Sequence, residues 1–179
     1  TRCRIVTGVQ TCALPILPAQ IRGGGQEMGR RAGTENVIGI AGFGAAAAAA
    51  ARELAEGVWE RVLGLRKVLD RELPGDDQRT ILVGKSAKRL PNTVCVATPG
   101  WKGETQVMAM DLAGFAISAG SACSSGKVRA SRVLTAMGLG PEAAAGAIRV
   151  SLGPGVTEEE VLRFAEAWRA RRDRAVVRV

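Results

Sequence analysis

A chain of 179 residues, 46% apolar and 23% charged, has room for one ordinary globular domain, or for one domain and part of another. It has no histidine and no tyrosine, which excludes Ser-His-Asp and Cys-His catalysis and histidine-based zinc sites within the chain. The net charge of +8 is concentrated at the two ends, with five arginines in residues 169–179, so it does not indicate a folded nucleic-acid-binding face.

Residues 1–16 show neither a strand period nor a helix period. Residues 6–16 (VTGVQTCALPI) look like the translation of a sequencing-adapter oligonucleotide, so we expect residues 1–16 to be an artefact joined to a genuine reading frame. On this interpretation Cys3 and Cys12 have no function, and the natural amino-terminal part of the protein is missing. The absence of a signal-peptide pattern and of paired cysteines indicates a reduced, cytoplasmic protein.

Residues 21–34 (IRGGGQEMGRRAGT) are polar and rich in glycine, which predicts a loop. Thr34 stands at the end of this loop, just before a predicted helix. A hydroxyl and free backbone amides at such a turn suit a phosphate. A threonine that only caps the helix is an equally good interpretation of the residues.

A long helix is predicted over residues 35–73. Seven consecutive alanines at 45–51 favour it, and an apolar stripe continues it through Leu54, Val58, Val62, Leu65 and Leu69. The most apolar stretch, residues 37–51, is glycine and alanine rather than leucine, so we expect no membrane span.

Short strands and helices are expected after the Pro-Gly turn at residues 74–77. A capping box, Thr157 to Glu160, opens the final helix. The mixture indicates an α+β domain. The predicted strands are 80–83, 93–97, 115–118 and 147–152, and the predicted helices are 104–112, 131–137, 143–146 and 157–172.

Residues 118–126 (SAGSACSSG) are all serine, alanine, glycine or cysteine, so no side chain there anchors a core. Cys123 is the one reactive group among them, and Lys127 and Arg129 nearby favour its thiolate form. A thiol on such a segment suits a nucleophile that receives a group at one place and delivers it at another. A small buried cysteine in a tight turn remains the alternative.

Arg149 interrupts an apolar strand and has the opposite parity from Ile148 and Val150. An arginine there binds a carboxylate through two parallel hydrogen bonds, or it extends from an edge strand into water. The residues alone leave both interpretations open.

The motifs together resemble the cysteine desulfurases, and within them the NifS-like group. The resemblance covers about residues 21–169 in order. It rests on GGGQEMGRRAGTEN (23–36), LPNTV (90–94), ISAGSACSSGKV (117–128), SRVLTAMG (131–138) and AIRVSLG (147–153).

The resemblance implies a class V aminotransferase relative of fold type I, a homodimer that uses pyridoxal 5′-phosphate to convert L-cysteine to L-alanine. Cys123 would be the nucleophile that becomes a persulfide, Arg149 would bind the substrate carboxylate, and Thr34 would contact the cofactor phosphate of the neighbouring subunit. The sulfur would pass to an acceptor protein such as an iron–sulfur scaffold, or to thio-cofactors. The resemblance implies no resident metal, no membrane and no nucleic acid beyond an indirect link to tRNA modification. It leaves open a transient contact of Cys123 with an iron–sulfur cluster.

The resemblance also implies a division of the chain. Residues 17–36 would be a remnant of the cofactor domain with a glycine-rich loop at the dimer interface, and 37–73 a connecting helix. Residues 74–172 would form the small carboxyl-terminal α+β domain, and 173–179 a tail whose reading frame the resemblance leaves open.

Two departures from the family stand out. None of the five lysines (Lys67, Lys85, Lys88, Lys102 and Lys127) matches the lysine that forms the Schiff base, and Arg132 stands where a histidine is common. This chain alone is therefore expected to be inactive. A selenocysteine lyase, an aminotransferase, or an inert fragment or binding module are the alternatives. An aminotransferase would need no cysteine in residues 118–126.

Overall fold

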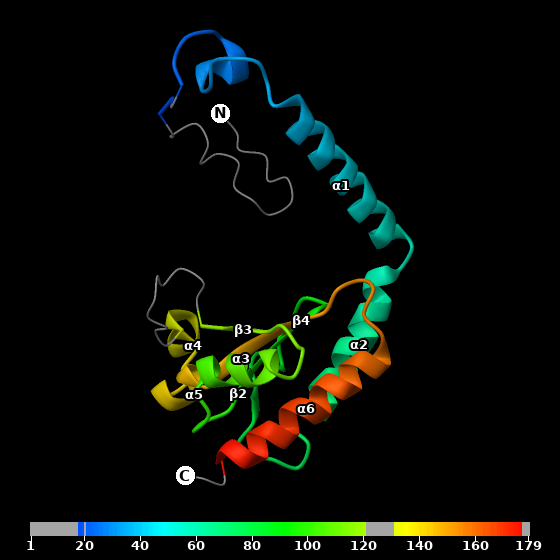
Figure 1. Cartoon of the computed structure of the whole chain (residues 1–179), viewed down its shortest axis with the longest axis vertical. Coiled ribbons are helices and arrows are strands. Elements are labelled where there is room, and N and C mark those ends of the chain that lie inside the picture. The colour runs from blue at the N-terminus through cyan, green and yellow to red at the C-terminus, as the bar shows by residue number, and fades with distance from the viewer. Residues whose placement is uncertain (1–17, 20, 121–130, 177–179) are drawn as a thin grey trace. The chain divides into compact units, whose positions relative to one another are not determined.

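The computed structural model describes residues 18–19, 21–120 and 131–176 (Figure 1). The chain divides into two compact units, residues 1–51 and 52–179. The artefact expected at 1–16, Cys123, and residues 177–179 of the expected tail lie outside the described residues.

The first unit holds the glycine-rich loop and most of helix α1 (Val37–Ala55). Ile21 and Arg31 form an isolated bridge, and a short 3-10 turn, η2 (Gln26–Gly29), lies between them. Asn36 caps α1, because its side-chain oxygen accepts a hydrogen bond from the Gly39 amide at 3.1 Å. The capping function that the sequence left open for Thr34 therefore belongs to Asn36.

Helix α1 has the length and apolar composition of a membrane-spanning helix, and none of it is buried in the structure. Alanine, valine and isoleucine keep this stretch apolar without any leucine-rich run. The match concerns length and composition only, so the expectation of no membrane span stays a prediction. A helix that another part of a protein covers has the same properties.

The prediction of one continuous helix over residues 35–73 is wrong, because the structure has two helices there. Helix α1 ends at Ala55 and α2 (Val58–Glu72) begins at Val58. Gly57 between them has a φ of 73°, in the left-handed region that interrupts a right-handed helix. The apolar stripe continues across the break, and periodicity alone does not reveal it.

The second unit contains a four-stranded sheet in the order β1-β2-β4-β3, with every neighbouring pair antiparallel. Figure 1 labels three of these strands, β2, β3 and β4. The strands are β1 (Ile81–Leu82), β2 (Thr93–Ala97), β3 (Ser118–Ala119) and β4 (Ala147–Ser151). Strand β2 has the predicted bounds. The strand expected at 115–118 is replaced by the two-residue strand β3, which shares only Ser118 with it. Phe115 instead packs edge-on against Phe164, with 5.4 Å between the ring centroids.

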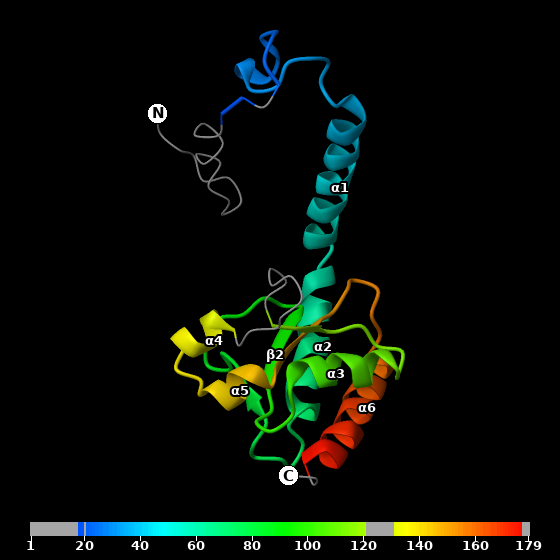
Figure 2. The ribbon, with the colours of Figure 1, turned by 60° about the vertical axis from the view of Figure 1, so that its left-hand side comes forward.

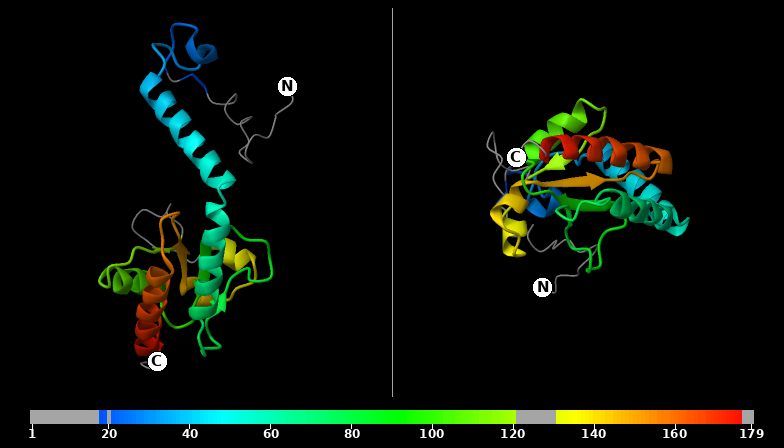
Figure 3. Two further views of the ribbon diagram at one scale, coloured as in Figure 1. Left: turned by 90° about the vertical axis from the view of Figure 1, so that its right-hand side faces the viewer. Right: turned by 90° about the horizontal axis from the view of Figure 1, so that it is seen from below.

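One face of the sheet carries the main core. Strand residues of one parity, Val94, Val96, Ile148 and Val150, pack there against α2, α3 (Gly103–Asp111) and α6 (Glu158–Val176). Figure 2 and Figure 3 show these helices gathered on the sheet, with α2 and α6 side by side. The short helices α4 (Arg132–Ala136) and α5 (Pro141–Ala145) contribute Leu134, Ala143 and Ala144 to a smaller second cluster.

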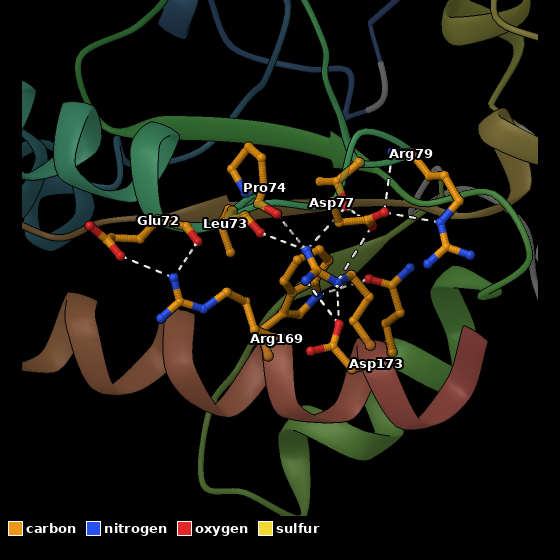
Figure 4. A network of polar contacts seen from close by, with 11 residues as sticks. Glu72, Leu73, Pro74, Asp77, Arg79, Arg169 and Asp173 are labelled. Carbon is orange, nitrogen blue, oxygen red and sulfur yellow. Dashed lines mark hydrogen bonds and ion pairs between the residues drawn. The ribbon is translucent and has the colours of Figure 1, made fainter. Parts of the chain in front are cut away.

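Helix α6 begins at the predicted capping box. The Thr157 hydroxyl accepts a hydrogen bond from the Glu160 amide, and the Glu160 carboxylate accepts one from the Thr157 amide. The helix continues to Val176, so residues 173–176 are helical rather than a separate tail. Its last turns bind the turn after α2, where Arg172 donates hydrogen bonds to the carbonyls of Leu73 and Pro74 (Figure 4).

Candidate functional site

The second face of the sheet brings Arg149 between two other side chains. Register places Arg149 of β4 directly opposite Cys95 of β2 on one side and opposite Ser118 of β3 on the other. Opposite residues on antiparallel strands point to the same face, with their Cβ atoms about 5 Å apart. Thiol, guanidinium and hydroxyl therefore form one row across three strands, on the face turned away from the main core.

This row forms the floor of a hollow of about 410 Å³. Ser131 and Leu134, from the start of α4, and Ala144 of α5 contribute to its walls. The Ser131 hydroxyl accepts a hydrogen bond from the Leu134 amide at 3.4 Å, which caps α4 beside the hollow. A pocket of this size with a few polar groups suits a small ligand.

The start of β4 is fixed by close backbone packing. A Cβ atom on Gly146 would lie 2.0 Å from the carbonyl oxygen of Thr98, so only glycine fits. The buried Gln106 amide donates to the carbonyls of Gly146 and Trp101, each at 2.8 Å, and accepts from Trp168 Nε1 at 3.0 Å. These bonds tie the entry of β4 to the core, and so they set the register that places Arg149.

Arg149 carries an exposed charge at this floor. Within residues 18–19, 21–120 and 131–176, no carboxylate lies within ion-pair distance of it. Strand β4 is bonded on both sides, so the interpretation of Arg149 as an edge-strand arginine is wrong, although the side chain does reach solvent.

Cys95 is half-buried, and burial raises the pKa of its thiol, while the charge of Arg149 acts in the opposite direction. From the sequence alone, Cys95 is one of the unpaired cysteines, with no assigned function. The alternation of Thr93, Cys95 and Ala97 with the buried valines of β2 already indicated that Cys95 faces away from the core. Its pairing with Arg149 depends on strand register, which the sequence does not contain.

Thr34 lies in the other unit and is exposed. Its carbonyl oxygen accepts a hydrogen bond from Arg31 Nη2 at 3.0 Å, and Gly33 before it has a φ of 94°. The Thr34 hydroxyl and the Arg31 guanidinium, which also pairs with Glu27 at 3.3 Å, supply donors that suit a phosphate. The structure does not bring Thr34 and Arg149 together in one unit, and Cys123 lies outside the described residues.

A second hollow, of about 230 Å³, lies between the end of β4 and α6. Most of its lining is apolar, with Glu160 and Arg163 as its charged residues. It lacks a thiol and a group of convergent donors, so the hollow at Arg149 is the better candidate for chemistry.

The class V aminotransferase family matches residues 14–164, which includes the last residues of the segment expected to be an artefact. The chain is 43% identical over 149 residues to a cysteine desulfurase, IscS 1, of Archaeoglobus fulgidus, covering 82% of this chain and 38% of that protein. It is 46% identical over 146 residues to a cysteine desulfurase of Gluconacetobacter diazotrophicus, covering 82% of this chain and 36% of the relative.

A solved structure gives the same result. The X-ray structure of a NifS-like protein from Rickettsia africae is 34% identical and has a TM-score of 0.74, over 88% of this chain and 40% of that one. The chain thus spans well under half the length of the relatives that it matches.

Proposed function

We propose that this chain, which belongs to the class V aminotransferase family, is the carboxyl-terminal part of a cysteine desulfurase. The observation that carries the proposal is its identity of 43% over 149 residues to a cysteine desulfurase. The hollow at Arg149 supports it, because a free guanidinium beside a cavity suits a small carboxylate substrate. Activity belongs to the complete protein, because this chain spans only 38% of that relative.

The reaction assigned to the complete protein converts L-cysteine to L-alanine and leaves a persulfide on Cys123. The Cys123 thiolate forms a sulfur–sulfur bond with the substrate sulfur, while the carbon–sulfur bond of the substrate breaks. Pyridoxal phosphate, when bound, supplies an electron sink for the substrate carbons. Arg149 orients the substrate by two parallel hydrogen bonds to its carboxylate.

Thr34 is assigned to the phosphate of the cofactor. Its exposed hydroxyl, with Arg31 beside it, fits a phosphate in donor chemistry. In the proposed homodimer, this contact reaches the cofactor of the neighbouring subunit. None of the chain's lysines is assigned to the covalent bond with the cofactor. This chain alone is therefore expected not to bind pyridoxal phosphate covalently.

The remaining parts of the proposal concern organisation and partners. Residues 17–36 are assigned to the edge of the cofactor domain, and residues 74–172 to the small domain. An iron–sulfur scaffold or another acceptor protein takes the sulfur, and a cytoplasmic location stays a prediction.

The decisive experiment replaces Cys123 by serine in the complete protein. Alanine formation from cysteine should be abolished while the cofactor stays bound, because a hydroxyl is a far weaker nucleophile than a thiolate at neutral pH. Ser124→Ala, which changes the neighbouring residue and keeps the thiol, is the matched control and should keep turnover. Near wild-type alanine formation in the Cys123→Ser variant would refute the assignment.

A further inference from the structure

The hollow at Arg149 is lined by a thiol, that of Cys95, which the proposed reaction does not use. Cys95 stands opposite Arg149 in the sheet and lines the same hollow. It belongs to β2, which is bonded to β1 and β4, so its backbone is held in place. A fixed thiol, a cation that no carboxylate of the described residues pairs with, and space for a small molecule thus lie together on one face.

We propose that Cys95 and Arg149 form a site at which small disulfides that carry a carboxylate, such as the disulfide of an amino acid, form a mixed disulfide with Cys95. Arg149 attracts and positions the carboxylate, and Cys95 reacts with the nearer sulfur. The site is distinct from the chemistry assigned to Cys123. It rests on the proposed function only in the role that Arg149 has as a carboxylate-binding residue.

The step is a thiol–disulfide exchange and needs no further oxidant. The Cys95 thiolate attacks one sulfur of the disulfide, and a new sulfur–sulfur bond forms as the original one breaks. The other half leaves as a thiolate and takes up the proton that Cys95 gave up. One disulfide is consumed and one is formed, so the electrons balance.

Two physical effects set the selectivity and the pH dependence. The exposed guanidinium of Arg149, the cross-strand partner of Cys95, raises the local concentration of carboxylate groups near the thiol. Salt screens this attraction. Burial raises the pKa of the Cys95 thiol, so the thiolate is a minor species at neutral pH and the exchange quickens as pH rises. Selectivity for the carboxylate therefore comes from Arg149 rather than from an unusually reactive thiol.

The product blocks the site that formed it. The half-disulfide stays in the hollow with its carboxylate at Arg149, where the proposed function places the carboxylate of cysteine. A thiol reductant releases it by the reverse exchange. Oxidised amino-acid thiols would thereby close the substrate pocket reversibly.

The test uses the 179-residue chain with two probes, cystine and the diamide of cystine, which carry the same ammonium groups and of which only cystine carries carboxylates. Trypsin cuts after Arg89 and Lys102, and Cys95 is the only cysteine in the peptide between them, so mass spectrometry follows it alone. Each rate is divided by the rate of the same probe with 2-mercaptoethanol, an uncharged thiol, which removes the intrinsic reactivity of the probe.

We expect a normalised preference of about fivefold for cystine, the factor that one close charge gives in water. Arg149→Gln should reduce the preference to about one, and Arg149→Lys should retain it because the charge is kept. Arg132→Gln, which removes an exposed charge at the start of α4, is the matched control and should leave the preference intact. Far-ultraviolet circular dichroism checks that each variant is folded.

Three results would overturn the proposal: no mixed disulfide at Cys95, equal normalised rates in the wild-type chain, or a preference that survives Arg149→Gln. The assay involves no turnover, so its outcome is separate from that of the proposed function. If the complete protein makes alanine but the chain shows no preference for cystine, only the proposed Cys95 site is refuted. If the chain prefers cystine but the complete protein makes no alanine, only the desulfurase assignment is refuted.

Discussion

Arg149 is the described residue on which the assigned chemistry depends most directly. In the complete protein, Arg149→Lys should lower kcat/KM for cysteine, because lysine keeps the charge but not the planar pair of donors. Losing one charge-assisted hydrogen bond costs about 1.5–3 kcal/mol, or roughly ten- to a hundredfold in kcat/KM. Steady-state kinetics with the melting temperature as control measures this, and an unchanged kcat/KM would leave Arg149 as a solvated surface charge.

Arg172 shows a different use of an arginine, because only 4% of it is exposed. Besides the carbonyls of Leu73 and Pro74, it lies 3.6 Å from the carboxylate of Asp77 (Figure 4). Burial would raise the pKa of Asp77, but hydrogen bonds from Arg79 and Thr80 and the charge of Arg172 hold that pKa below its ordinary value.

This arrangement predicts a pH dependence of stability. A carboxylate with a depressed pKa stabilises the fold at pH values above its unfolded-state pKa and loses this effect as pH falls through the folded value. The free energy of unfolding of the wild type should therefore decrease as the pH is lowered from about 4. The free energy of unfolding of Asp77→Asn should decrease less over the same pH range. Urea unfolding at a series of pH values measures both, with Asp76→Asn, an exposed neighbour, as control. Parallel curves for wild type and Asp77→Asn would contradict the prediction.

Two glycines, one between α1 and α2 and one inside α2, allow a matched pair of substitutions that tests the helix break. Gly57 has a φ of 73° between α1 and α2, whereas Gly64 lies inside α2 with open space around its Cα. Gly57→Ala should destabilise the protein by about 1 kcal/mol through backbone strain. Gly64→Ala should stabilise it by about 0.4–1 kcal/mol, because alanine restricts the unfolded chain. Equal effects of the two substitutions in chemical denaturation would rule out the left-handed break at Gly57.

The elements that the sequence predicts well are those with a local signal. Strand β2 follows from the alternation in residues 93–97, and the start of α6 follows from the Thr157–Glu160 capping box. The break at Gly57 has no comparable signal, because one glycine costs a helix only about 1 kcal/mol and the apolar stripe continues past it. The strand expected at 115–118 does not form at Phe115, because the Phe115 ring packs against Phe164, a contact between residues 49 apart that no local pattern indicates.

The candidate site divides in the same way. Strand parity placed Arg149 on the face opposite Ile148 and Val150, and the structure agrees. Cys95 as its neighbour was missed, because 54 residues separate the two and only the register of β2 on β4 joins them. The sequence therefore identifies single reactive residues more readily than it identifies the rows that they form.

The buried core of the described chain lies entirely in the unit of residues 52–179. In residues 18–19 and 21–51 no residue is buried, and Val37, Ile38, Ile40 and Phe43 of α1 expose 59–88% of their surface. Apolar side chains exposed along a whole helix usually mark a surface that another polypeptide or a membrane covers. This agrees with a chain that spans 38% of a matched relative. The stability of the chain by itself therefore depends mainly on the unit of residues 52–179, which holds the core.

The whole chain, purified as it stands, should fail to hold pyridoxal phosphate through dialysis. Thr34 fits a phosphate, but none of the lysines is assigned to the covalent bond, and a phosphate contact from an exposed turn contributes little affinity by itself. After mixing and dialysis, the absorbance of lysine-bound cofactor should be absent, and borohydride should trap no stoichiometric adduct in the peptide map. The complete protein, treated in parallel, should retain one cofactor for each chain. A single, stoichiometric borohydride-trapped lysine in the 179-residue chain would contradict the prediction and would place the cofactor lysine within this sequence.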